Sequence, residues 1–451
     1  MASKRKRVMI LTYVWPPFAA VGVYRILKFC KYLRDFEIDP IIFTPKNPNT
    51  MSMDEGLKEM VPDGIPVYHS YSLEPFRWRP DKDKQQKKND SGEKNEGNPT
   101  QDRPPQEPSL LSKLKKTIRL HMTVPDGIYF WTWSGLYKGI SAARRENVDL
   151  ILSSSPPQSI HILGSRIARA IDKPHLADFR DLWTQNAKIE ERQLPAHLER
   201  RNRNLEKMVL EKAAGITVNT DSFREQLLEK NHFLDETMVR VVTNGVDPDD
   251  FSNISRKLTP NEKFTMVYTG SLYRQRGPEF FFIALQKWIE RRPEIEDKIK
   301  AVFIGNWAPE HAGLLDKYNL GKVIDRRGWM PQIEALKATF EADLLLLFQG
   351  FDPNFAAAVP RKLGEYMITN VPIMAFALPG EITRLVDQYN CGASFYSEDP
   401  EPIIAYLDRM FEEWSIRQEN NQPTANGLRK MPDLETCGQV RKLAKLCHQI
   451  C

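Results

Sequence analysis

The segment VPRKLGEYMITNVPIMA, residues 359–375, carries the pattern that decides the predicted fold. Pro360 ends a loop, apolar residues at helical spacing follow it, and an apolar run over 372–375 then indicates a short buried strand. A helix followed at once by a buried strand is typical of parallel sheets covered by helices. The same alternation continues outward from this segment along both halves of the chain.

The start of this helix also carries charges that suit a nucleotide sugar. Arg361 and Lys362 bring positive charge to backbone amides that favour phosphate oxygens. Glu365, one turn after Arg361, is placed to accept hydrogen bonds from a ribose diol. Leu363 packs inward and is also assigned to the donor-binding residues of this segment. A solvated helix start with ordinary charges explains this segment equally well, so other segments have to decide between the two interpretations.

Apolar runs along the chain predict an α/β fold with two doubly wound, Rossmann-like domains. Ser222 and Glu225 in the series SFRE are expected to open a helix as a capping box. The expected strands span 8–13, 39–43, 150–153, 175–178 and 215–219 in the first half, and 265–269, 300–304, 323–326, 343–347 and 372–375 in the second.

Chain length supports this division into two domains. The 451 residues, 41% hydrophobic and 27% charged, suffice for two cores of roughly 200 residues each. We expect an N-terminal domain over 1–243 and a C-terminal domain over 244–425, with a hinge near 244–253. A C-terminal helix within 426–451 is expected to pack back on the N-terminal domain.

Composition argues against several classes of protein. A net charge of +5 is weaker than the basic stripe of a nucleic-acid-binding protein, so no nucleic-acid partner is expected. Apolar runs stay shorter than the roughly 18 residues of a membrane-spanning helix, and no signal-peptide cleavage site follows the basic leader. The five cysteines lack disulfide or metal spacing, which predicts a cytoplasmic protein without a metal site. His161 and His175 lie among apolar residues and are expected to be packed side chains.

Two neighbouring segments differ from this globular pattern. Residues 80–108 contain no aromatic or β-branched aliphatic side chain, and they are predicted to form a disordered insertion. Residues 110–122 then place apolar side chains on one face of a helix and lysines elsewhere. Docking on its own domain is favoured for this helix over peripheral contact with a membrane, although a lipid-linked acceptor would shift that balance.

Charged and glycine residues follow the strands of the first half, where open α/β sheets bind ligands. Gly22 allows close backbone approach and Arg25 is placed to reach a cleft, although a structural turn is slightly favoured for this motif alone. Asp178, Arg180 and Asp181 crowd another strand end. These residues either bind a ligand or form a structural Asp–Arg pair, and the sequence leaves both interpretations open.

The second half places glycines and arginines after its strands. Gly270 admits a diphosphate close to the backbone, and Arg274 and Arg276 are expected to neutralise it. A later strand ends in residues that suit the edge of a nucleobase, although a packed tryptophan is an equal alternative. These residues are Gly328, Trp329 and Met330.

Taken together, these motifs resemble those of the retaining, family-4-type glycosyltransferases of the GT-B fold, in which two Rossmann-like domains face a central cleft. The matching segments are PPFAAVG (16–22) for the acceptor-side loop, SSSPP (153–157) and DFRDLW (178–183) for a bacterial subgroup, VTNGVDPDDF (242–251) for the hinge, and TGSLYRQRG (269–277) with 359–373 for the donor side. The resemblance covers almost the whole chain apart from 80–108.

Two positions depart from the family pattern. Glu365 matches the second of two glutamates separated by seven residues, whereas Ala357 occupies the first position. Ser271 and Arg276 stand where the family has a donor-phosphate arginine and lysine, and Arg274 is a candidate to compensate.

The resemblance implies transfer of a sugar from a nucleotide-diphosphate sugar to a hydroxyl of a sugar or lipid-linked acceptor, with the anomeric configuration kept. Neither a metal nor a cofactor beyond this co-substrate is expected. Arg276 and Lys362 would hold the diphosphate, and Asp181, positioned by Arg180 and Asp178, would orient the acceptor or the reacting sugar. The implied setting is cell-surface polysaccharide or glycolipid synthesis in the cytoplasm, at the inner face of the membrane. A catalytically silent binding or assembly subunit and a sugar-nucleotide epimerase are the alternatives.

Overall fold

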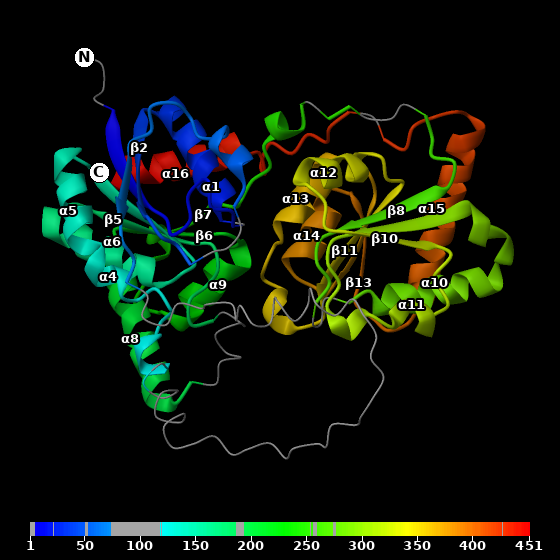
Figure 1. Cartoon of the computed structure of the whole chain (residues 1–451), viewed down its shortest axis with the longest axis horizontal. Coiled ribbons are helices and arrows are strands. Elements are labelled where there is room, and N and C mark those ends of the chain that lie inside the picture. Colours follow the sequence, from blue (N-terminus) through cyan, green and yellow to red (C-terminus); the bar gives the residue numbers. More distant parts are fainter. Residues whose placement is uncertain are drawn as a thin grey trace, which may run out of the picture. The chain divides into compact units, whose positions relative to one another are not determined.

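The computed structural model describes residues 5–20, 22–49, 53–73, 118, 120–185, 194–252, 254–255, 259–273, 277–425 and 427–451. The chain divides into two compact units (Figure 1). The first comprises Met1–Thr217, Asn231–Val239 and Ala444–Cys451, and the second comprises Val218–Lys230 and Arg240–Leu443. The predicted insertion 80–108 and most of the predicted helix 110–122 lie outside the described residues.

A seven-stranded sheet forms the centre of the first unit, in the order β3-β2-β1-β4-β5-β6-β7. The strand pairs from β3 to β5 are parallel. The strands are β1 (Lys6–Leu11), β2 (Ile38–Pro45), β3 (Val67–Ser70), β4 (Leu150–Ser155), β5 (His175–Phe179), β6 (Gly215–Val218) and β7 (Val239–Val241). The helices are α1 (Val23–Tyr32), α4 (Trp131–Ser134), α5 (Leu136–Arg145), α6 (Ser159–Ile171) and α8 (Ala196–Lys212).

Alternating side chains of this sheet build its core. Met9 and Leu11 of β1 pack against Leu163 and Ile167 of α6 in one apolar cluster, because every second residue of a strand points to the same face. Phe43 of β2 stacks on a buried tryptophan of α4 within the same cluster. Burial of these side chains supplies the main driving force for folding of the unit.

Two histidines form a buried polar cluster inside this unit. Ser153 Oγ lies 2.7 Å from both His161 Nδ1 and His175 Nε2. Since one hydroxyl carries one proton, Ser153 donates to one ring and accepts from the other. Burial lowers the pKa of His175 to about 3 and holds the pKa of His161 well below its usual value. Both rings are therefore neutral packing groups, as expected.

This cluster predicts a loss of stability in mild acid. Unfolded histidines bind protons below a pKa of about 6.5, whereas His175 in the folded chain stays neutral down to about 3. The free energy of unfolding should therefore fall as the pH drops below about 6.5, with His175 contributing about 2 kcal/mol between pH 7 and pH 5. Denaturant titrations at the two pH values measure this change. The variant His175→Gln should show a smaller pH dependence, and equal slopes for the two proteins would contradict the prediction.

A six-stranded sheet forms the centre of the second unit, in the order β10-β9-β8-β11-β12-β13, with every pair parallel. Its strands are β8 (Phe264–Thr269), β9 (Ile299–Ile304), β10 (Ile324–Gly328), β11 (Leu344–Gly350), β12 (Ile373–Ala377) and β13 (Gly392–Phe395). The helices of this unit are α9 (Asp221–Lys230), α10 (Glu279–Arg291), α11 (Leu314–Lys317), α12 (Gln332–Phe340), α13 (Arg361–Ile368), α14 (Glu381–Gln388) and α15 (Glu401–Glu419).

Helices cover both faces of this second sheet. Met266 and Tyr268 of β8 face a cluster that includes side chains of α10 and α15, whereas Val267 between them faces a cluster that includes side chains of α12, α13 and α14. Figure 1 shows these two groups of helices on opposite sides of the sheet. Because both faces are covered, central strands such as β11 and β12 are mainly apolar, as is usual for parallel sheets, whereas the edge strand β10 carries charged residues.

The last helix, α16 (Thr436–Ile450), contributes its end to the first unit. There, Leu446 packs close to Gly215 at the start of β6, and the ring of His448 lies 2.9 Å from the carbonyl oxygen of Phe36. Within the described ranges, every helix is too short or too polar to cross a membrane.

All ten expected strands are present, but three short strands and one helix cap differ from the expectation. The strands β3, β7 and β13 were not predicted, because runs of only three or four residues give little signal. The predicted cap at Ser222 is wrong: Thr220 Oγ1 accepts the hydrogen bond from Phe223 N. Ser222 instead donates twice to Glu381, through its backbone N–H and its hydroxyl.

Candidate functional site

Each sheet has one point at which its strand order reverses. In the first unit this point lies between β1 and β4, and in the second it lies between β8 and β11. In open α/β sheets, the loops that leave the carboxyl ends of such a pair of strands run in opposite directions, and ligands commonly bind between them. Most of the residues singled out in the sequence follow these strand ends.

In the second unit, glycines stand at the carboxyl ends of three adjacent strands. Gly270, Gly305 and Gly328 have positive φ angles of 128°, 132° and 65°. Their backbones interlock, because Gly270 N donates to Ile304 O at 2.7 Å and Gly305 N donates to Gly328 O at 2.6 Å. A Cβ atom at Gly305 would lie 2.3 Å from the carbonyl oxygen of Gly270. These strand ends, which we call the glycine floor, therefore present backbone without side chains.

The ammonium group of Lys362 lies beside this glycine floor. A Cβ atom at Gly270 would be 2.4 Å from Lys362 Nζ. The ammonium donates to the hydroxyl of Tyr268 at 3.1 Å and lies 4.3 Å from the centre of its ring. That hydroxyl in turn donates to the carbonyl oxygen of Ser271 at 3.1 Å. The structure thus brings Gly270 and Lys362 together, with a positive charge held next to backbone that carries no side chain.

Arg361 does not join Lys362 at the glycine floor. Its Nε atom lies 2.9 Å from Glu365 Oε1, and Gln332 contacts the same oxygen at 3.5 Å. A ribose diol would therefore have to compete with Arg361 for the Glu365 carboxylate. Leu363, predicted among the donor-binding residues, has a fully buried side chain, and its N–H already donates to Pro360 O. Its predicted contact with a donor is thus not available through either group.

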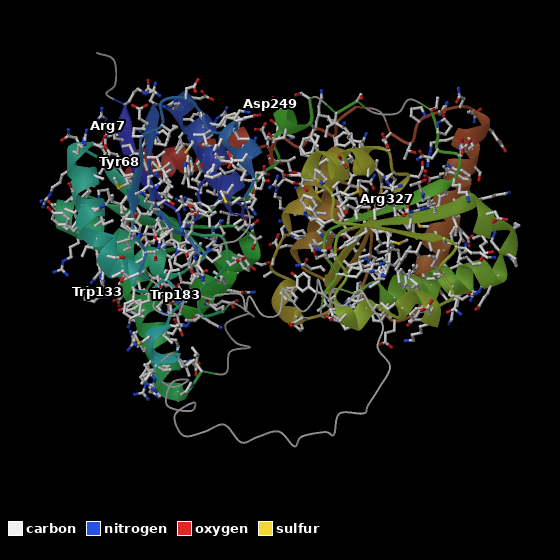
Figure 2. The ribbon with its side chains drawn as sticks, viewed as in Figure 1. Arg7, Tyr68, Trp133, Trp183, Asp249 and Arg327 are labelled. Atoms are coloured by element: carbon white, nitrogen blue, oxygen red, sulfur yellow. The ribbon has the colours of Figure 1, made fainter. Side chains whose placement is uncertain are left out.

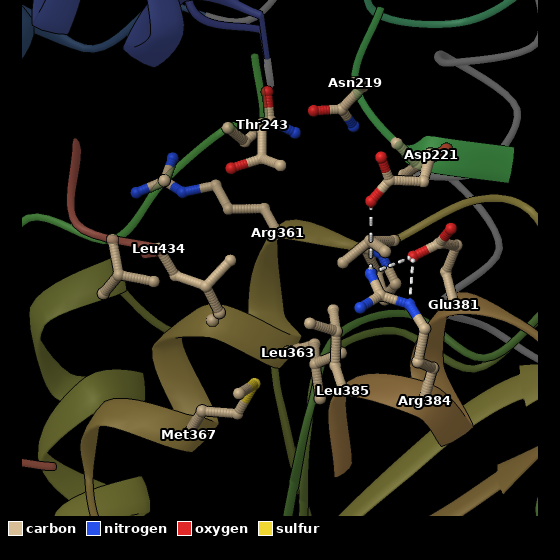
Figure 3. Close-up of a pocket in the computed structure, with 17 residues that line it drawn as sticks. Asn219, Asp221, Thr243, Arg361, Leu363, Met367, Glu381, Arg384, Leu385 and Leu434 are labelled. Atoms are coloured by element: carbon tan, nitrogen blue, oxygen red, sulfur yellow. Dashed lines mark hydrogen bonds and ion pairs between the residues drawn. The ribbon is translucent and has the colours of Figure 1, made fainter. Parts of the chain in front are cut away.

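Arg361 lines a separate pocket of the second unit that encloses about 560 Å³, including the solvent at its mouth (Figure 3). Leu363, Met367 and Leu385 supply apolar walls. A chain of ionic contacts runs along one side, from Asp221 to Arg384 at 3.7 Å and from Arg384 to Glu381 at 2.6 Å. Asn219, 5% exposed, lines the pocket with an amide oxygen that has no hydrogen-bond partner among the described residues.

The predicted nucleobase residues have different exposures. Trp329 is 74% exposed, so the alternative of a packed tryptophan is wrong. Met330 is partly buried against the apolar cluster beneath α12 and α13. Arg274 and Arg276, predicted to neutralise a diphosphate, lie outside the described residues.

In the first unit, Asp178 and Arg25 form a buried ion pair instead of facing a ligand. Both guanidinium N–H groups that face Asp178 donate to it, at 2.7 and 3.0 Å, and Ser154 and Thr217 donate to the same carboxylate. The side chains of Arg25 and Asp178 are 3% and 0% exposed. Although burial raises the pKa of Asp178, the charge and hydrogen bonds of Arg25 bring it below its usual value. The two charges are thus used by one another, and the acceptor-side role of both residues stays a prediction.

Arg180 lies at the reversal point of the first sheet. Its Nε atom donates to Ser155 O at 2.6 Å and its Nη2 atom donates to Pro156 O at 2.8 Å, both at the end of β4. Its Nη1 atom lies against Gly22, where a Cβ atom would be only 1.3 Å away. Asp181 is half-buried next to it in sequence. The structure therefore places Gly22 and Arg180 in contact.

The end of the same motif is fixed to α8. Trp183, labelled in Figure 2, is fully buried, and its indole N–H donates to Asn202 Oδ1 at 2.8 Å. Thr184 donates from its backbone N–H and its hydroxyl to Glu206 of the same helix. These contacts hold the loop that carries Arg180 and Asp181.

Sequence reasoning missed Tyr268, Gly305 and the pocket residue Asn219. Tyr268 occupies an inward position of a strand, where an aromatic residue ordinarily signals packing. Gly305 in the series VFIGNW follows a strand just as Gly270 does, and this shared position was the available signal. Asn219 gave no such signal, because most of the residues that line the pocket with it lie far away in the sequence. Across the described ranges, no group of three or more His, Cys, Asp or Glu residues is placed to hold a metal ion.

Comparison with known proteins adds a family match and a set of similar structures. Residues 97–250 match the family described as Glycosyltransferase Family 4. No curated protein matches the chain. Among solved structures, the chain is similar to a sucrose-phosphate synthase from Thermosynechococcus elongatus, with 12% identity and a TM-score of 0.56 over 99% of this chain and 97% of that one.

Two further structures show the same likeness. The lipopolysaccharide outer core galactosyltransferase WaaB, in its apo form, has 10% identity and a TM-score of 0.55, with 98% and 99% of the two chains covered. A UDP-GlcNAc 2-epimerase from Methanocaldococcus jannaschii has 12% identity and a TM-score of 0.51, with 98% and 99% covered. At such identities the likeness shows a shared fold. The predicted fold class, two Rossmann-like α/β domains as in GT-B glycosyltransferases, is confirmed.

Proposed function

We propose that this protein is a glycosyltransferase that moves a sugar from a nucleotide-diphosphate sugar to a hydroxyl group. The observation that carries the proposal is the position of the Lys362 ammonium. Lys362 stands at the start of α13, and its ammonium lies beside the side-chain-free backbone of Gly270. A fixed cation, bare backbone and a helix start together suit a diphosphate. The family match over 97–250 and the GT-B fold support the same class of enzyme.

The proposed reaction depends on stabilising the leaving group. The bond between the anomeric carbon and the diphosphate oxygen breaks, and the acceptor oxygen bonds to the same carbon from the same face, so that the configuration is kept. The departing phosphate oxygen takes the acceptor proton. Lys362, together with Arg276, would neutralise the charge that develops on the diphosphate, and such stabilisation of developing charge usually contributes most to catalysis. Asp181 would orient the acceptor or the reacting sugar. No metal is needed in this scheme.

Residues around the glycine floor would hold the rest of the donor. Trp329 offers an exposed indole face for a nucleobase, next to the backbone of Gly328. Glu365 would accept the ribose hydroxyls once Arg361 releases it. Exchange of one partner for another keeps the carboxylate hydrogen-bonded throughout, which limits the cost of the exchange.

The proposed setting is synthesis of a cell-surface polysaccharide or glycolipid, in the cytoplasm and at the inner face of the membrane. The similarity in fold to a lipopolysaccharide galactosyltransferase motivates this setting. The acceptor would be a sugar or a lipid-linked sugar. Contact with lipid through 110–122 belongs to the same proposal.

A catalytically silent binding subunit is the second candidate, and one observation favours it. Ala357, which stands where the family has its first glutamate, is 5% exposed, and its carbonyl oxygen accepts from Thr220. This position therefore offers no carboxylate to the sugar. An epimerase is a third candidate, since the likeness to a UDP-GlcNAc 2-epimerase extends over nearly the whole chain.

A two-stage experiment separates these candidates. Thermal unfolding of the full chain with UDP-, GDP- and ADP-sugars first identifies a donor, since a ligand at 100 times its dissociation constant stabilises the fold by about 2.7 kcal/mol. The donor is then incubated with and without candidate acceptors. A glycoside product with retained anomeric configuration, measured by NMR, supports the proposal. Binding without turnover supports the silent subunit, and isomerisation of the donor alone supports the epimerase.

Tyr268 is expected to position the Lys362 ammonium for this reaction. The variant Tyr268→Phe keeps the buried ring and removes only the hydroxyl that accepts from Lys362. Loss of a hydrogen bond to a charged group should lower kcat/KM for the donor about tenfold. Tyr406→Phe, in the same apolar cluster, is the matched control and should leave kcat/KM unchanged. Equal kinetics in the two variants would remove Tyr268 from the site.

A further inference from the structure

Among the residues that the structure describes, no carboxylate forms an ion pair with the positively charged Arg180. Its guanidinium is held by two carbonyl oxygens, those of Ser155 and Pro156, and within the described ranges no Asp or Glu forms an ion pair with it. Carbonyl groups fix the position of a cation but supply no net negative charge. The side chain is half-buried, and burial lowers the pKa of Arg180 to about 10. It is nevertheless fully charged at neutral pH.

The carboxylates nearest in sequence do not fill this role. Asp178 already binds Arg25 with both oxygens, so its charge is neutralised inside the unit. Asp181 adds a negative charge nearby but makes no ion pair with Arg180. A purely structural arginine in this loop would be expected to have a close acidic partner, because partly buried charges are normally paired.

The guanidinium lies where open α/β sheets commonly bind ligands. Arg180 connects the loop after β4 with the turn before α1, and these are the loops that diverge at the reversal point of the first sheet. Its Nη1 atom makes no hydrogen bond in the part of the chain that the structure describes. A planar donor group with an unused N–H suits a carboxylate or phosphate oxygen.

We infer that Arg180 binds an anionic group, a phosphate or a carboxylate, of a substrate at the reversal point of the first sheet. This deepens the proposed function, on which it rests, by assigning a charged substrate to the protein. The anion replaces the missing carboxylate partner. Gly22 is part of the same subsite, because only a residue without a side chain leaves room for the guanidinium.

The experiment measures binding of two minimal anions, inorganic phosphate and acetate, by calorimetry at constant ionic strength. It uses full-length Lys362→Ala as the reference, so that the contribution of the proposed donor-phosphate site is reduced and is the same in every variant compared. Adding Arg180→Gln to this reference should weaken binding of at least one anion about tenfold or more. Adding Arg145→Gln, which removes an exposed arginine of α5, should leave binding unchanged. Preference for phosphate or for acetate shows which anionic group the subsite takes.

A second pair of variants tests the geometry without changing any charge. Gly22 has a φ of −73°, which alanine adopts freely, but its methyl group would occupy the place of Arg180 Nη1. Gly22→Ala in the same reference should therefore displace the guanidinium and weaken anion binding as Arg180→Gln does. Gly127→Ala, whose Cβ atom would meet nothing within 4 Å, is the control.

Two outcomes would overturn the inference. One is that the reference and its Arg180→Gln derivative bind each anion with the same affinity, or that neither protein binds either anion. The other is a lower unfolding temperature of Arg180→Gln without any change in anion binding, which would show a structural arginine. The probes contain no nucleotide, so this result is independent of the donor screen that tests the proposed function.

Discussion

Replacement of Lys362 by alanine is expected to lower turnover by about 10² or more, with the fold intact. The ammonium is the cation that the structure fixes beside the glycine floor, held by the hydroxyl and the ring of Tyr268. A charge held in place before the reaction costs no reorganisation when the diphosphate departs, so its removal raises the barrier directly. If kcat falls in addition to any rise in KM, the ammonium acts in the transition state.

Steady-state kinetics with the donor found in the thermal screen check this expectation. Lys337→Ala removes an exposed lysine of the neighbouring helix α12 and should behave as the unchanged protein does. Equal unfolding temperatures of the two variants would show that any kinetic difference is local. Normal turnover in Lys362→Ala would refute the assignment of this residue to the donor diphosphate.

Removal of the Asp178 carboxylate is expected to destabilise the protein by about 3 to 5 kcal/mol. The variant Asp178→Ala leaves the guanidinium of Arg25, 3% exposed, without its counter-charge. It also leaves the hydroxyl groups of Ser154 and Thr217 without their acceptor. An uncompensated buried charge costs much more than the ion pair itself contributes, and this difference sets the size of the effect.

Denaturant unfolding measures the loss, and neighbouring variants give the controls. Asp181→Ala removes a half-buried carboxylate three residues away and should change the free energy of unfolding by no more than about 0.5 kcal/mol. The double variant Arg25→Met/Asp178→Leu, which removes both charges, should recover most of the stability. A loss below about 1 kcal/mol in Asp178→Ala would mean that water reaches Arg25 and that the pair is not truly buried.

The fold could be predicted from the sequence because its signal repeats along the chain. Among the described residues, the long apolar runs became strands and the helical patterns between them became covering helices, so local periodicity was sufficient there. The edge strand β13 was missed because GASF has neither length nor branched aliphatic residues. The cap at Thr220 was missed because Thr220 and Ser222 have equivalent hydroxyl groups, and only the position of Glu381 decides between them.

The candidate site was predictable only in part. Gly270 and Lys362 were expected near one another because both follow strand ends or helix starts at the same edge of a sheet. The pairing of Arg25 with Asp178, 153 residues away, was not expected, because a sequence does not show which charged side chains are buried together. Arg361 and Lys362 point to different partners although they are adjacent, since successive helix residues face different directions.

The glycine floor has a consequence for protein engineering. Its shape is set by the backbone, and any side chain at Gly305 would meet the carbonyl oxygen of Gly270. Randomised libraries that include Gly305 would therefore yield mostly misfolded clones. Diversity intended to change the preferred sugar nucleotide belongs instead at exposed neighbours such as Trp329 and Gln332. New specificities on this scaffold are therefore expected to arise from substitutions at these exposed neighbours of the glycine floor.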